Sequence, residues 1–119
     1  MRSHKDLDVY QDALTLSVSV IQLTKKFPAH ERYGLTSQVS RSAVSIPSNI
    51  AEGAARQYNK EFIQFLYISL GSAAELETQL TISQRLSFIT KEELDSHVQL
   101  LASVTKRLYG LVKYVKGKS

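Results

Sequence analysis

The chain has 119 residues, of which 43% are hydrophobic and 22% are charged, and its formal net charge is +4 at pH 7. These values are typical of a single globular domain, and they exclude an intrinsically disordered chain. Because the sequence contains no cysteine, disulfide bonds and thiolate metal sites are excluded as well.

The first predicted helix covers about residues 9–27. From Val9 to Phe27, apolar residues recur at spacings of 4, 3, 4, 3 and 4, which is the pattern of an amphipathic helix. Pro28 ends the segment, because proline cannot continue a helix. Since a single apolar stripe is enough to face one core, a second stripe predicts a further packing partner. That second stripe consists of Tyr10, Leu14, Val18 and Ile21.

The second predicted helix covers about residues 36–56 and contains the stretch "SIPSNIAEG". Pro47 lacks the amide hydrogen that would bond to the carbonyl of Ala43, which costs about 3 kcal/mol in a helix interior. The apolar spacing nevertheless continues in phase across the proline, so we predict one helix with a kink at Pro47. We expect the free carbonyl to be met by water or by a small hydroxyl. The short polar side chains nearby are Ser45, Ser48 and Asn49.

The third predicted helix covers about residues 60–86, and its opening, "FIQFLYISL", is apolar on almost every side. Such a helix must be covered from several directions, so we expect burial against another subunit. If the second and third helices form an antiparallel hairpin, Ser45 lies opposite residues 71–72, where small side chains let the helices approach closely. The same register predicts an ion pair between Arg41 and a carboxylate of Glu75 or Glu77, within the subunit or across an interface.

The fourth predicted helix covers about residues 91–116. Its start, "ITKEEL", has the form of a capping box, with Thr90 as N-cap and Glu93 three residues later. No segment shows the alternation of a β-strand bounded by turns. Short connections between long amphipathic helices predict antiparallel neighbours. The expected fold is therefore all-α, a single antiparallel up-and-down four-helix bundle.

Two polar surfaces are candidates for binding. From residue 106 to the end there are five basic residues and no acid, which either attracts phosphate groups or simply places solvated cations at a helix C-terminus. On the second helix, polar residues at spacings of 4, 4, 3 and 4 share one face. This polar stripe consists of Arg41, Ser45, Asn49, Glu52 and Arg56. It has two interpretations. Its side chains either face solvent or line a subunit interface, or they form a recognition surface for RNA or a protein.

Catalytic and metal-binding patterns are missing from the sequence. The three histidines, His4, His30 and His97, lie on different segments without the spacing of a metal motif. There is no GxSxG elbow, and no phosphate-binding glycine loop. Glu75 and Glu77 diverge by about 200° around a helix, so they do not form a carboxylate pair. We expect no enzymatic activity, no cofactor and no metal.

Residues 1–10 lack the apolar stretch of a signal peptide, and no apolar run approaches 18 residues. We therefore expect a cytoplasmic protein without a membrane partner.

Long motifs in the chain closely resemble the four-helix-bundle proteins encoded by intervening sequences in bacterial 23S rRNA genes. The motifs are "FPAHERYGLTSQVSRSAVSIPSNIAEGAAR", "FIQFLYISLGSAAELETQL" and "LSFI". The resemblance implies an antiparallel four-helix bundle, a ring-shaped homopentamer and no enzymatic activity. The family includes accessory proteins of diversity-generating retroelements, which are basic and bind nucleic acid and a reverse transcriptase.

One departure concerns the second helix, where family members often carry consecutive basic residues after "LTSQ" and a leucine. This chain has "VSRSA", with Arg41 alone, which weakens the expectation of nucleic-acid binding there. Two functions remain open. The first is a homopentameric scaffold that binds RNA or DNA, with RNA favoured, and the second is a protein-interaction module that presents the polar stripe. The basic residues predicted to contact nucleic acid are Arg32, Arg41, Arg56, Lys106, Arg107 and Lys113.

Overall fold

The computed structural model describes residues 3–118, apart from the side chain of Asp6. This part of the chain contains four α-helices and no β-strand, which confirms the predicted all-α bundle. The α-helices are α1 (Asp8–Thr24), α2 (Leu35–Ala54), α3 (Asn59–Arg85) and α4 (Lys91–Lys116), and two short 3-10 helices are η1 (His4–Asp6) and η2 (Ala29–Glu31). Helix α1 ends three residues before the expected boundary, because residues 25–27 form a turn in which the Phe27 amide donates to the Thr24 carbonyl.

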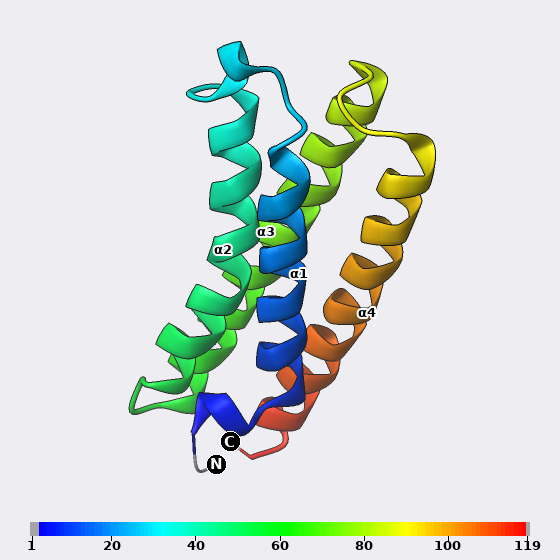
Figure 1. Ribbon diagram of the computed structural model, residues 1–119. Coiled ribbons are helices and arrows are strands. Elements are labelled where there is room, and N and C mark those ends of the chain that lie inside the picture. Colours follow the sequence, from blue (N-terminus) through cyan, green and yellow to red (C-terminus); the bar gives the residue numbers. More distant parts are fainter. Residues whose placement is uncertain (1–2, 119) are drawn as a thin grey trace.

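The four helices run up and down in chain order (Figure 1). Each helix packs against its neighbours in the sequence, α1 also packs against α4, and the α2–α3 contact is the most extensive. The α2–α3 turn lies at the same end of the bundle as both chain ends, whereas the α1–α2 and α3–α4 connections lie at the other end (Figure 1). The molecule is elongated, with extents of 46 × 25 × 19 Å.

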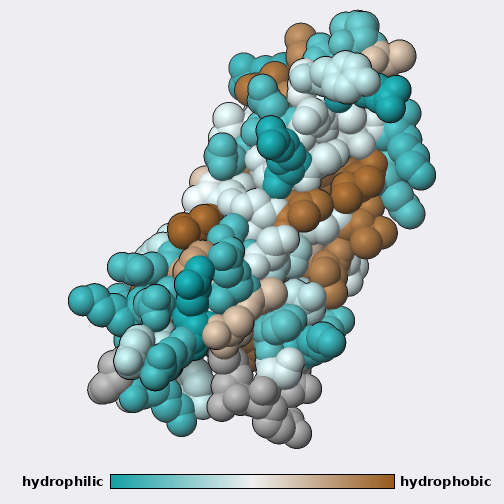
Figure 2. Space-filling view, turned by 90° about the vertical axis from the view of Figure 1, so that its left-hand side faces the viewer, coloured by the Kyte–Doolittle hydropathy of each residue, from teal (hydrophilic) through white to brown (hydrophobic). Residues whose placement is uncertain are grey.

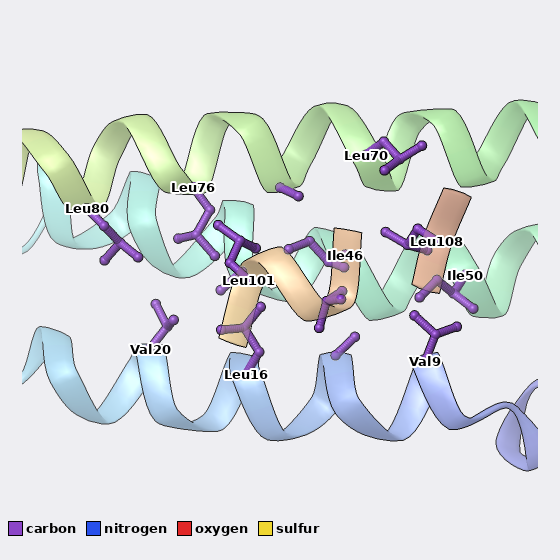
Figure 3. Packing of buried hydrophobic residues seen from close by; sticks show 14 of the residues in the cluster. Val9, Leu16, Val20, Ile46, Ile50, Leu70, Leu76, Leu80, Leu101 and Leu108 are labelled. Atoms are coloured by element: carbon purple, nitrogen blue, oxygen red, sulfur yellow. The ribbon is translucent and has the colours of Figure 1, made fainter. Parts of the chain in front are cut away.

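The core is a continuous column of aliphatic side chains from all four helices. Figure 3 shows Leu16, Ile46, Leu76 and Leu101 pointing from α1, α2, α3 and α4 toward the same axis. All four are fully or almost fully buried. Burying one such side chain stabilises the fold by about 1.5–3 kcal/mol, so this column supplies the main driving force for assembly of the bundle.

Helix α2 continues without interruption across Pro47, as the apolar phase predicted. The carbonyl of Ala43, which has no amide partner at position 47, lies 2.8 Å from the hydroxyl of Ser17 on α1 and accepts a hydrogen bond from it. The same hydroxyl lies 2.9 Å from the Ala13 carbonyl of its own helix, so the two carbonyls share its one proton. The expected small hydroxyl is therefore present, but it comes from another helix and not from the neighbouring residues of α2. The side-chain amide of Asn49 donates to a different carbonyl, that of Ser45. The kink at Pro47 stays a prediction.

Close packing between α2 and α3 confirms the predicted register. The hydroxyls of Ser45 and Ser72 are 2.8 Å apart, and the hydroxyl of Ser69 donates to the carbonyl of Ile46 over 2.9 Å. At Gly53 a Cβ atom would lie only 2.6 Å from the Cβ atom of Phe65. Small side chains are thus required along this contact, because larger ones would push the two helices apart.

The capping box at the start of α4 is present as predicted. The Glu93 amide donates to the Thr90 hydroxyl over 3.1 Å, and the Thr90 amide donates to the Glu93 carboxylate over 2.8 Å. The same carboxylate accepts hydrogen bonds from the ammonium group of Lys26, just beyond the end of α1. Glu93 therefore caps α4 and also joins it to the α1–α2 connection.

The contacts of Glu93 predict a pH-dependent contribution to stability. The hydrogen bond from Lys26, followed by the bond from the Thr90 amide, holds the pKa of Glu93 below its ordinary value of 4.5. A carboxyl group with a lowered pKa in the folded state stabilises the protein above the unfolded-state pKa, and this stabilisation is lost as pH falls through the folded-state pKa. Glu93→Gln keeps the capping bonds but removes the charge, so we expect it to cost about 0.5 kcal/mol at pH 7 and less at pH 3.

Thermal unfolding of both proteins at pH 7 and pH 3 tests this expectation. Glu92→Gln is the matched control, because Glu92 lies in the same helical turn and makes no ion pair within the described chain. An equal loss of stability at both pH values would show that the charge of Glu93 does not matter.

Candidate nucleic-acid interface

The C-terminal half of α4 presents one basic face to solvent. Leu108, Val112 and Val115 are buried against the other helices, and Leu111 packs against the core as well, so the remaining residues of this segment face outward. No acidic residue follows Asp95 in the sequence. Four outward residues at spacings of 3, 4 and 3 form one stripe, namely Lys106, Tyr109, Lys113 and Lys116.

A tyrosine from α3 completes this surface. The ammonium group of Lys116 donates to the Tyr67 hydroxyl over 3.3 Å and lies 5.6 Å from the centroid of the Tyr67 ring. Tyr67 is 46% exposed and Tyr109 is 56% exposed, so both rings are accessible beside the ammonium groups. We call these five residues the tyrosine–lysine face: Tyr67, Lys106, Tyr109, Lys113 and Lys116.

A second polar surface lies between α2 and α3, around the predicted polar stripe. An open hollow of about 390 Å³ is lined by residues that include Arg41, Ser72, Glu75 and Gln79. The side-chain oxygen of Gln79 is buried there and has no hydrogen-bond partner among the described residues. Arg41 and Glu75 share this hollow, but no ion pair within residues 3–118 joins Arg41 to Glu75 or Glu77. The predicted pair across an interface stays a prediction.

Comparison with known proteins now identifies the family. Residues 5–110 match the family described as 23S rRNA-intervening sequence protein. The chain belongs to this family. A solved structure from Bacteroides thetaiotaomicron, described as a protein with unknown function from the S23 ribosomal protein family, is 30% identical and superposes with a TM-score of 0.81. The similarity covers 88% of this chain and 98% of that one. No curated protein matches the sequence.

In this 23S rRNA-intervening sequence protein, the six basic residues predicted to bind nucleic acid do not form one surface. Arg32 follows η2, at the opposite end of the bundle from the C-terminal turn of α4. Arg56 pairs with Glu52 over 3.2 Å, and Arg107 pairs with Asp12 of α1 over 3.0 Å. Among the predicted six, two belong to the tyrosine–lysine face, namely Lys106 and Lys113.

Sequence reasoning included Lys116 in the basic C-terminal segment, but it missed Tyr67 and Tyr109 as binding residues. The helical spacing of Tyr109 relative to Lys113 was a usable signal. Tyr67 had no such signal, because it joins the face only through the packing of α3 on α4, 49 residues away from Lys116 in the sequence.

The polar stripe on α2 is partly satisfied by its own hydrogen bonds. The Asn49 amide donates to both the carbonyl and the hydroxyl of Ser45, at 2.8 and 2.9 Å. Glu52 and Arg56 form an ion pair one turn apart. Among the charged residues of the stripe, Arg41 alone forms no ion pair within the described chain. Arg41 lines the hollow, so a partner that recognises the stripe by its charge would bind there.

One serine–histidine contact has the composition of a catalytic pair. The Ser19 hydroxyl lies 2.8 Å from Nε2 of His97, and Nδ1 of His97 lies 2.7 Å from the Glu93 carbonyl, which requires Nδ1 to donate. Both residues lie inside long helices, where the backbone amides already bond within the helix and cannot stabilise an oxyanion. The contact serves to join α1 to α4.

Residues 3–118 lack two structural features, a cluster of metal ligands and an apolar helix of bilayer length. This part of the chain contains no group of three or more histidine, aspartate or glutamate side chains that could hold a metal ion. None of its helices combines the length and hydrophobicity that crossing a bilayer requires.

Proposed function

We propose that this protein is a non-catalytic homo-oligomeric scaffold, a pentamer, that binds RNA through the lysines of the tyrosine–lysine face. The observation that carries the RNA-binding part is the grouping of three lysines on an acid-free stretch of helix. Phosphate groups are attracted to such a surface because binding releases the counterions condensed on the nucleic acid. Membership of the 23S rRNA-intervening sequence family agrees with this proposal, as does the basic net charge of +4.

The oligomeric part rests on apolar side chains that the single chain leaves in solvent. Figure 2, which views the bundle from the side of α2, shows a band of hydrophobic surface across the middle of that face. Val18 on α1 is 56% exposed, and Ile21 and Val44 are exposed as well. Val18 and Val44 directly follow Ser17 and Ala43, whose hydrogen bond joins α1 to α2. Large exposed apolar patches mark association surfaces, so a further copy of the chain is expected to cover this one.

Light scattering coupled to gel filtration tests the assembly. We expect the wild-type protein to have five times the 13.4 kDa mass of one chain. Val18→Asp combined with Val44→Asp should reduce the mass to that of smaller species, because charges would be buried in the interface. Gln57→Asp, on the exposed α2–α3 turn, is the control and should leave the mass unchanged. A wild-type protein that is monomeric at micromolar concentration would contradict the oligomeric proposal.

Fluorescence anisotropy with a labelled 20-nucleotide RNA tests the binding. Affinity should fall as KCl is raised from 25 to 200 mM, and binding that does not respond to salt would contradict phosphate recognition. Replacing Lys106, Lys113 and Lys116 by glutamine should make the slope of log K against log salt shallower by about 2. The control replaces Lys25, Arg85 and Lys91, which lie at the other end of the bundle, with the same loss of charge.

A protein-interaction module is the second candidate function, and the hollow between α2 and α3 favours it. The buried Gln79 oxygen needs a hydrogen-bond donor, and Arg41 lacks a carboxylate partner in the described chain. A polypeptide that supplies both groups would complete the site. Under this alternative, nuclease treatment leaves the complex with the partner intact, and Arg41→Gln abolishes it without changing the salt dependence of RNA binding.

A further inference from the structure

We infer that the tyrosine–lysine face selects single-stranded nucleic acid, with bases stacked on the rings of Tyr67 and Tyr109. This inference rests on the proposed function and adds the class of ligand and the residues that distinguish it. Lysines alone recognise phosphates in any nucleic acid, whereas exposed aromatic rings bind bases whose faces are accessible. The combination of both on one surface is the arrangement that single strands require.

The two rings lie along one direction of the bundle. Tyr109 and Lys116 are two helical turns apart on the same stripe of α4, which corresponds to about 10.5 Å along the helix. Since Lys116 contacts the hydroxyl of Tyr67, the Tyr67 ring lies near that end of the stripe. A strand that uses both rings must present the faces of two bases, which are stacked inside a duplex and hidden there.

Small residues follow Tyr67 on the exposed surface of α3. On α3, the residues that follow Tyr67 at helical spacing are Gly71 and Ala74, and both are exposed. At Gly71 no atom lies within 4 Å of the position that a Cβ atom would occupy, apart from the adjacent residues and the backbone of the same helix. A planar base can therefore approach α3 beside Tyr67 without meeting a large side chain at these two positions. The small residues make room, and the rings and ammonium groups supply the attraction.

The ammonium groups are placed to hold the backbone of the same strand. Lys113 lies between Tyr109 and Lys116 on the stripe, one turn from each. Lys116 rests against the Tyr67 ring in the unbound protein, at 5.6 Å from its centroid. When Lys116 turns to a phosphate, the face of the Tyr67 ring becomes free for a base. Duplex RNA has no exposed base faces along its length, so it would engage the lysines alone.

Tyrosine substitutions separate stacking from charge. Tyr67→Leu and Tyr109→Leu remove the ring at exposed positions, so the fold should persist. Each is expected to weaken the binding of a labelled 20-nucleotide single-stranded RNA by about 5-fold to 150-fold, since stacking of one base contributes about 1–3 kcal/mol. Tyr109→Phe should bind like the wild type, because the ring is retained. Tyr33→Leu is the matched control, as Tyr33 is 87% exposed at the other end of the bundle.

The same RNA annealed to its complement is the second probe. We expect at least about 10-fold weaker binding of the duplex by the wild type, and no effect of the tyrosine substitutions on that binding. Equal affinity for both probes, or unchanged single-strand binding in both leucine variants, would overturn the inference. If binding is then still lost on replacing the three lysines, the proposed function stands without stacking. If the wild type binds neither probe at 25 mM KCl, the proposed RNA-binding function itself is wrong.

Discussion

Replacing Gly53 by alanine is expected to destabilise the bundle by about 2 kcal/mol. A Cβ atom at this position would lie 2.6 Å from Phe65 Cβ, 2.9 Å from Phe62 Cδ1 and 3.3 Å from the Phe62 carbonyl oxygen. A Cβ atom cannot rotate away from these neighbours, so α2 and α3 must separate. We expect this separation to cost about 3 kcal/mol, the upper end of the usual range for overpacking. The better helix propensity of alanine offsets about 1 kcal/mol of this cost.

Glycines elsewhere in the helices provide a matched control with the opposite sign. Gly71 and Gly110 lie inside α3 and α4. At either position no atom lies within 4 Å of an added Cβ atom, apart from the adjacent residues and the backbone of the same helix. Gly71→Ala and Gly110→Ala should each stabilise the protein by about 0.5–1 kcal/mol. Urea unfolding followed by circular dichroism, at one fixed protein concentration, compares the three variants. If Gly53→Ala is as stable as Gly110→Ala, α2 and α3 are not in close contact at Gly53.

Replacing Ser17 by alanine is expected to cost about 2 kcal/mol, because the buried carbonyl of Ala43 then loses the hydrogen bond from the Ser17 hydroxyl. The cost should depend on Pro47. In Pro47→Ala, the new amide at position 47 donates to the Ala43 carbonyl within the helix, so removing the Ser17 hydroxyl from that background should cost less than about 1 kcal/mol.

A double-mutant cycle measures this dependence as a coupling energy of about 1–2 kcal/mol. Pro47→Ala by itself should be stabilising by about 1 kcal/mol, since removing the proline penalty of about 3 kcal/mol outweighs the loss of about 2 kcal/mol of buried ring surface. Ser48→Ala is the control, because Ser48 is an exposed serine beside the proline. If Ser17→Ala reduces the free energy of unfolding equally in both backgrounds, the Ser17 hydroxyl does not stabilise the Ala43 carbonyl that the proline leaves without an amide partner.

The four helices and their order were predictable from the sequence because the signals that define them are local. The apolar period of α1 and the capping box formed by Thr90 and Glu93 each depend on residues at most four positions apart. The α2–α3 register was also predictable, since a short turn leaves little freedom and the small residues around Ser45 and Ser72 select one alignment. Membership of the intervening-sequence family was likewise carried by long continuous motifs.

Contacts between distant segments were decided by the tertiary structure. Ser17 supports the Ala43 carbonyl across 26 residues, and Lys116 meets Tyr67 across 49. The six basic residues that were predicted to bind nucleic acid together are spread over both ends of the bundle. Their positions in the sequence do not show which helix surfaces will lie side by side in the fold. Helical period and capping act within one turn and are readable from the chain itself, whereas a binding face joins side chains of two helices, and only the packing of α3 on α4 brings them together.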